Sequence, residues 1–261
     1  MCWSLEVSVG VCCFELLSIA WIYRRNATPL DRAVVPVLLS VALVELGEAI
    51  IWAQGVPNYL GRDHLNPTCG PLSAANVLRK APMLLCCYAV VSQPLLMCSC
   101  CRRMMQPPSA WRQRAFRVGE IASAAILLSK ALSHGLTRYV GVCVAGVGRH
   151  GHLIWRIGRN VGVPQIAISA VYFTCFLALP MALALPRAMR ALPALTTACY
   201  LFAFRVYPGG GEAYSFWCLT GVTANTFVLC TPYWRWAFGS TVSEEEAHTK
   251  KKRGRAHMKA G

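Results

Sequence analysis

Acidic side chains inside apolar stretches are the first residues of this sequence that could do chemistry. Glu45 and Glu48 stand three positions apart, which places them on one face of a helix. Glu15 lies in an earlier apolar stretch and Lys130 in a later one. Because a charged side chain at the centre of a bilayer costs about 2.5–3.5 kcal/mol, such residues usually face the interior of a helix bundle, where they are paired or functional.

Three interpretations of these residues stay open. In the first, the acids line a path for protons or cations. In the second, two carboxylates and a histidine form a general acid–base set for catalysis. In the third, Lys130 pairs with one acid and the other acids form hydrogen bonds. We therefore treat Glu15, Glu45, Glu48 and Lys130 as one candidate intramembrane polar site.

Two cysteines between the apolar stretches form a second candidate feature. Cys69 and Cys143 lie in the two longest connecting segments that share one predicted side of the membrane. If that side is oxidising, a disulfide between them would persist and tie the segments together. Two unrelated cysteines are the alternative, and Cys2 is a possible competitor for either partner.

The same region holds two patterns that resemble ligand sites. His150 and His152 lack a nearby cysteine or acid at compatible spacing, so the ligand count for zinc is not reached. Residues 146–151 match G-x-G-x-x-G formally, but they lie between apolar blocks and not in a βαβ unit. We predict no metal ion and no cofactor, and the glycines are interpreted as turn residues.

The elements that must position these residues follow from the composition. Of 261 residues, 56% are hydrophobic and 14% are charged, whereas about 25% are charged in a soluble domain. The apolar residues come in blocks of about twenty, the length that spans a bilayer as a helix. We predict an all-α, polytopic bundle over residues 1–238 with seven transmembrane spans, the sixth unusually short. They are Leu5–Tyr23, Val34–Gly55, Ala81–Cys101, Val118–Leu136, Val163–Leu185, Ala191–Val206 and Ala213–Trp234.

The distribution of positive charge predicts the orientation. The segments on one side of the membrane carry about twice as many Lys and Arg residues as those on the other side. Basic loops stay in the cytosol, which puts the N-terminus outside and the C-terminus inside. The net charge of +15 would suggest nucleic acid in a soluble protein, but here it lies between spans and in the tail. Residues 239–261 are predicted to be a disordered cytosolic tail that binds anionic lipid headgroups, with no nucleic-acid partner.

Several short motifs, taken in order, resemble a family of uncharacterised seven-span membrane proteins from bacteria, algae and large DNA viruses. The matching motifs are Met1-Cys2-Trp3-Ser4, Glu45-Leu46-Gly47-Glu48, Cys69-Gly70, Gln93-Pro94, the stretch from Cys143 to His152-Leu153-Ile154-Trp155, and Trp217-Cys218. Many members have Gln where this chain has Glu48, and members are richer in aromatic residues and histidine around the later spans. The resemblance implies a seven-helix fold and no particular activity.

The resemblance also gives weight to residues that the composition alone does not single out. It implies an outer cap that contains Trp3, His152, Trp155 and Trp217, with Glu45 beneath it in the membrane. Our first hypothesis is a multi-pass membrane protein that transports a small solute or an ion through its intramembrane acids. The alternatives are a membrane-embedded enzyme with an outward-facing site at His152 and Glu45, and a receptor or scaffold.

Overall fold

The structure is a computed structural model of the whole chain. It describes residues 4–25, 29–55, 77–104, 110–137, 142–147 and 153–157, together with residues 180, 197–198, 201–202, 222, 226 and 228–230. The predicted tail, residues 239–261, lies outside the described part of the chain.

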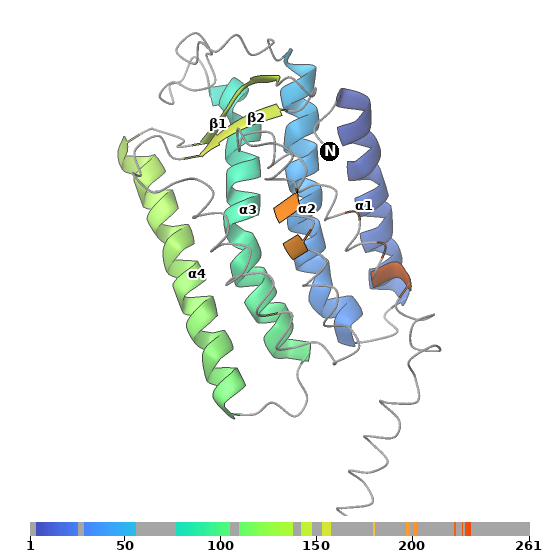
Figure 1. Cartoon of the computed structure of the whole chain (residues 1–261), viewed down its shortest axis with the longest axis vertical. Helices are drawn as coiled ribbons and strands as arrows, with labels where there is room; N and C mark the ends of the chain where they lie inside the picture. Colours follow the sequence, from blue (N-terminus) through green and yellow to red (C-terminus); the bar gives the residue numbers. More distant parts are fainter. Residues whose placement is uncertain are drawn as a thin grey trace, which may run out of the picture.

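Four long helices and one antiparallel hairpin make up most of the described structure. The helices are α1 (Leu5–Arg25), α2 (Pro29–Ala53), α3 (Val77–Met104) and α4 (Ala110–Thr137), and the strands are β1 (Val142–Val147) and β2 (Leu153–Ile157). The helices lie side by side in chain order, so α2 packs on α1 and α3, and α3 packs on α4 (Figure 1). The hairpin lies at the end of α3 where that helix begins (Figure 1). We call this end of the helix bundle the hairpin end. The opposite end contains Arg25, and we call it the Arg25 end.

The helices confirm the predicted helical fold for the first four apolar segments. Three stretches are long and apolar enough to cross a membrane, namely Leu5–Arg25, Ala33–Ala53 and Val77–Arg103. Helix α4 has the length, but it is not among these three, and its predicted span carries Glu120, Lys130 and His134. The last three predicted spans lie almost entirely outside the described residues. Their few described positions, among them 197–198, 201–202 and 228–230, are helical.

Local sequence explains where the first two helices begin and end. The Ser4 hydroxyl accepts a hydrogen bond from the Val7 amide at 3.3 Å, as an N-cap residue does. After α2, the Gly55 amide donates to the Trp52 carbonyl, and Gly55 has a φ of 74°. Glycine adopts this left-handed conformation without steric cost and commonly ends helices in this way. The second helix therefore stops at Ala53, two residues before the predicted end of the span.

Small residues set how closely the helices approach. A Cβ atom added to Gly47 of α2 would lie 2.9 Å from the Pro82 carbonyl oxygen of α3 and would also meet the Cys86 sulfur. Beside this contact, the Cys86 thiol donates to the Val44 carbonyl at 3.4 Å. A Cβ at Gly119 of α4 would lie 2.8 Å from the Cys98 sulfur of α3. Such small-residue contacts are typical of helix pairs in membranes.

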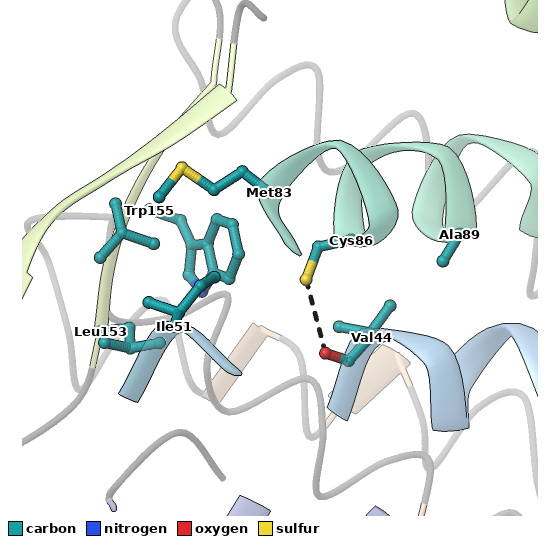
Figure 2. Close-up of a cluster of buried hydrophobic side chains, with 8 residues drawn as sticks. Val44, Ile51, Met83, Cys86, Ala89, Leu153 and Trp155 are labelled. Atoms are coloured by element: carbon teal, nitrogen blue, oxygen red, sulfur yellow. Dashed lines mark hydrogen bonds between the residues drawn. The ribbon is translucent and has the colours of Figure 1, made fainter. Parts of the chain in front are cut away.

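The hairpin covers the hairpin end of the α2–α3 pair. Val144 pairs with Trp155 across the two strands, with an irregularity between Val144 and Gly146. Figure 2 shows Trp155 and Leu153 against Ile51 of α2 and Met83 of α3. The hydropathy pattern predicts a loop for this segment. The short apolar runs on both sides of a glycine-rich stretch are the signal for a hairpin.

At the Arg25 end, one arginine joins three parts of the chain. The Arg25 guanidinium forms two hydrogen bonds to the Asp31 carboxylate, at 2.8 and 3.0 Å. It also donates to the carbonyl oxygens of Val228 and Leu229, at 3.0 and 2.8 Å. Asp31 is fully buried, so the ion pair is shielded from solvent. The start of α2 is thereby tied to the end of α1 and to the last predicted span.

The contact at Gly47 generates a stability prediction. We expect Gly47→Ala to destabilise the protein by about 1–3 kcal/mol, because the methyl group overpacks the α2–α3 interface. The matched control is Gly10→Ala, since nothing lies within 4 Å of a Cβ at that position. Glycine inside a helix costs about 0.5–1 kcal/mol relative to alanine, so the control should be unchanged or more stable. Denaturant unfolding in detergent, followed by circular dichroism, measures both, and equal stability of the two variants would contradict the assignment.

Candidate functional site

The Glu45–Glu48 segment of α2 places both acids inside the protein. Glu45 is 0% exposed and Glu48 is 1% exposed, whereas Leu46 between them is 41% exposed. Gly47, between them, packs tightly against Pro82 and Cys86 of α3. The expected common face is therefore observed, and it is the face that packs against neighbouring helices.

Glu15 reaches the same interior from α1. It is fully buried, on the face that also buries Ser8, Cys12, Ser18 and Ile22. The Cys12 thiol donates to the Ala42 carbonyl at 3.7 Å, which fixes the register between α1 and α2. Glu15 follows Cys12 by three residues on α1, and Glu45 follows Ala42 by three residues on α2. Cys12 thus lies between the two acids across the α1–α2 interface.

The register gives the spacing of the acids along the helix axes. With 1.5 Å per residue, Glu45 lies about 4.5 Å from Ala42 towards the hairpin end, and Glu48 about 9 Å. Glu15 lies about 4.5 Å from Cys12 in the other direction. The three acids therefore follow one another along the α1–α2 pair over about 13.5 Å. Glu15 and Glu45 are each close to the midpoint of their candidate membrane span.

A lysine that the hydropathy pattern predicts outside the spans is also buried. Helix α3 begins at Val77, four residues before the predicted span, and so takes Lys80 into the helix. Lys80 is 0% exposed. Because Val44 lies opposite Cys86, Glu48 falls opposite Pro82, and Lys80 is about 3 Å further along the axis. The position of Lys80 at the edge of an apolar block, beside Arg79, gives no sequence signal of burial.

The structure places Lys130 elsewhere. Lys130 is half-buried on α4, which packs on α3. Helix α3 therefore lies between Lys130 and α2, which carries Glu45 and Glu48. Lys80 lies near the axial level of Glu48 because α3 begins at Val77, earlier than the hydropathy suggests. That Lys130 joins the acids stays a prediction.

A buried amide extends the polar residues into α3. Gln93, from the Gln93-Pro94 motif, is 1% exposed and lies near the middle of Val77–Arg103. Neutral or charged polar side chains are therefore buried near mid-length in each of the three candidate spans. Carboxyl groups in series can bind and pass protons, and carboxylate oxygens also bind small cations.

Most of the predicted outer cap lies outside the described residues. Of its aromatic residues, Trp155 is described, and it is buried against α2 and α3. Trp3, His152 and Trp217 are outside the described part of the chain.

The predicted disulfide is also not described. Cys69 lies outside the described residues, and of Cys143 only the backbone is described, which pairs with Arg156. The cysteines whose side chains are described carry free thiols; they are Cys12, Cys13, Cys86, Cys87, Cys98, Cys100, Cys101 and Cys230. Among the described residues, no group of three or more His, Cys, Asp or Glu side chains has an arrangement that could hold a metal ion.

Comparisons with known proteins were made against family models, curated proteins and solved structures. No family model matches the chain, and no curated protein or solved structure shows significant similarity to it.

The position of Lys80 generates a prediction about charge balance. We expect Lys80→Met to lower the free energy of unfolding by about 3 kcal/mol or more, because it removes a buried positive charge at the level of a buried acid. The double variant Lys80→Met/Glu48→Leu should lose less free energy of unfolding than the two single variants lose in sum. We expect a coupling energy of at least about 1 kcal/mol.

Arg79→Met is the matched control for this cycle. Arg79 is adjacent in sequence but exposed, so its loss should change stability by no more than about 1 kcal/mol. Denaturant unfolding of the four proteins in one detergent gives the coupling energy. Strictly additive losses would show that Lys80 and Glu48 do not balance each other.

Proposed function

We propose that this chain is a multi-pass integral membrane protein that conducts protons or small cations through the acids Glu15, Glu45 and Glu48. The proposal includes seven spans with the N-terminus outside and the C-terminus in the cytosol, as in the seven-span family that the motifs resemble. The observation that carries it is the complete burial of Glu15 and Glu45 near the midpoints of two packed, apolar helices.

The energetic argument starts from the cost of a charge at this depth. An acid at the centre of a membrane helix costs about 2.5–3.5 kcal/mol on insertion scales, and this chain has two such positions on adjacent helices. Packing alone would be served at lower cost by leucine or methionine of similar volume. Acids that are nevertheless present in membrane spans mark ion pathways and proton relays.

The arrangement supplies successive sites and not one isolated site. Along the helix axes, Glu48 and Lys80 lie nearest the hairpin end and Glu45 comes next. Glu15 lies farthest from the hairpin end. The axial steps are about 4.5 Å from Glu48 to Glu45 and about 9 Å from Glu45 to Glu15. Cys12 lies within the longer step and Ser8 and Ser18 are buried on the same face. Bridging water is needed where the step exceeds hydrogen-bond distance.

A flux measurement in proteoliposomes tests this function. With a pH-sensitive dye inside, an imposed potential should drive acidification faster than in empty vesicles. We expect Glu45→Gln to reduce the initial rate by about a hundredfold, the smaller end of what a positioned proton-transfer group contributes. Glu15→Gln should act in the same direction.

Glu6→Gln is the control for the flux experiment. It is the same chemical change on α1, but Glu6 is exposed at the end of the helix, so the rate should stay at the wild-type value. Circular dichroism of each reconstituted variant checks that the fold is kept. A wild-type protein that transports no faster than empty vesicles, under both proton and alkali-cation gradients, would overturn the proposal.

The orientation and the Cys69–Cys143 bridge form a separate part of the proposal. It is supported by the position of β1, which carries Cys143 and packs on α3 at the hairpin end. The segment that contains Cys69 joins α2 to α3, and both helices meet it at this end. A bridge would therefore fasten the connection between α2 and α3 to the hairpin that covers them.

Disulfide mapping with a tagged C-terminus tests this part. We expect a peptide that contains Cys69 linked to Cys143 under non-reducing digestion, and we expect the tag to be reached only after the cells are permeabilised. Thiol labelling of intact cells should modify neither cysteine until a reductant is added. Two free cysteines, or a tag that is accessible from outside, would contradict the bridge or the orientation respectively.

A further inference from the structure

We infer that the outward face of α4 binds an anionic phospholipid, with the headgroup at the Arg25 end and the acyl chains along the helix. The inference rests on the proposal that α4 spans the membrane. It concerns a different face of the protein from the buried acids.

Unbalanced positive charge gathers where α3 ends and α4 begins. Arg103, Arg114 and Arg117 are exposed. Residues 102–120 contain one acid, Glu120. Its carboxylate accepts a hydrogen bond from Arg102 at 2.9 Å, so it is already engaged. The remaining guanidinium groups match the charge and the planar bidentate geometry of a phosphate.

A tryptophan lies at the same level. Trp111 is 58% exposed, and the Arg112 guanidinium lies 5.4 Å from the centre of its ring. Tryptophan is enriched at membrane–water interfaces because one side of the indole is apolar and its N–H is polar. This residue therefore indicates the depth at which headgroups meet α4.

An apolar stripe continues from this level along the same face. Its members recur at spacings of three, four or seven and are 56% to 71% exposed; they are Val118, Ile121, Leu128 and Leu132. The opposite face, with Phe116, Gly119 and Ser123, is turned towards α3. From Arg117 to Leu132 the helix rises about 22 Å, which exceeds the depth of one leaflet of a bilayer with a core of about 30 Å.

The positive charge at one end of this stripe favours an anionic lipid over a neutral one. A neutral lipid would cover the stripe but would leave the exposed arginines without a counter-charge. An anionic phospholipid supplies both a phosphate at the level of Arg114 and Arg117 and chains of the right length for Val118 to Leu128. A basic residue near an anionic membrane surface contributes about 1 kcal/mol.

Lipid binding to the purified full chain tests the inference. Native mass spectrometry in a non-ionic detergent would compare phosphatidylglycerol with phosphatidylcholine of the same chains. We expect phosphatidylglycerol to be retained preferentially by the wild type. Arg114→Gln/Arg117→Gln should weaken this binding by about thirtyfold, the effect of removing two basic residues.

The matched control has the same change in net charge at other exposed positions. Arg24→Gln/Arg79→Gln should bind phosphatidylglycerol as the wild type does, since both residues are exposed and neither lies on α4. Glycerol phosphate, which carries the headgroup chemistry without acyl chains, should not displace the lipid.

Three results would overturn the inference. They are equal retention of the two lipids, equal losses in the two double variants, and full displacement by glycerol phosphate. A lipid-free dimer that Ile121→Asn dissociates would also overturn it, because a second copy of the chain would then cover the stripe.

Discussion

The close contact of Gly47 with Pro82 and Cys86 sets the separation of α2 and α3, and the buried polar residues depend on that separation. Every residue larger than glycine at position 47 would push the helices apart or shift their register. The register in turn determines that Lys80 falls at the level of Glu48, and that Trp155 finds Ile51 and Met83 at the hairpin end. The glycine between the two acids thus affects the position of the buried charges, of the neighbouring helix α3 and of the hairpin that covers both helices.

The second constraint is the need to balance charge away from water, which the Arg25 end meets with a buried ion pair. At the Arg25 end, the buried Asp31 receives two hydrogen bonds from Arg25, whose remaining hydrogen bonds go to helix carbonyls at 228 and 229. The five N–H donors of the guanidinium allow it to bind the carboxylate and both carbonyl oxygens at once. At the hairpin end, Lys80 and Glu48 are buried on facing helices beneath an apolar cover. Removing one partner of the Arg25–Asp31 pair leaves an uncompensated charge in a low dielectric, which is why a buried ion pair is costly to break.

The sequence predicted the helices well, because hydropathy alone determines where they form. It predicted the site less well, because the burial of a residue such as Lys80 depends on where a helix begins. The helices over the first four apolar segments and the burial of Glu15, Glu45 and Glu48 follow from periodicity and from the cost of a charge in lipid. Lys80 was missed because a lysine at the edge of an apolar block usually marks the interface. In the structure the helix starts earlier, at Val77, and carries Lys80 inside. The hairpin was missed because two short β-prone runs beside glycines are a weak signal against strong neighbouring helices. Lys130 lies on α4, which packs on α3, whereas Glu45 and Glu48 lie on α2, so its place among the acids stays a prediction.

The same packing bears on what could pass along the acids. At Gly47 the backbone of α3 approaches α2 so closely that a methyl group would already meet the Pro82 carbonyl oxygen. An interface of this kind has no room for a hydrated solute between the two helices. A proton needs no such room, because it moves between carboxyl groups and bridging water by exchange of hydrogen bonds. Among the substrates that the proposed function allows, a path along the α2–α3 interface would therefore favour the proton over a cation that must keep part of its hydration shell. The flux experiment separates the two, since a proton relay responds to a pH gradient in vesicles that contain no permeant alkali cation.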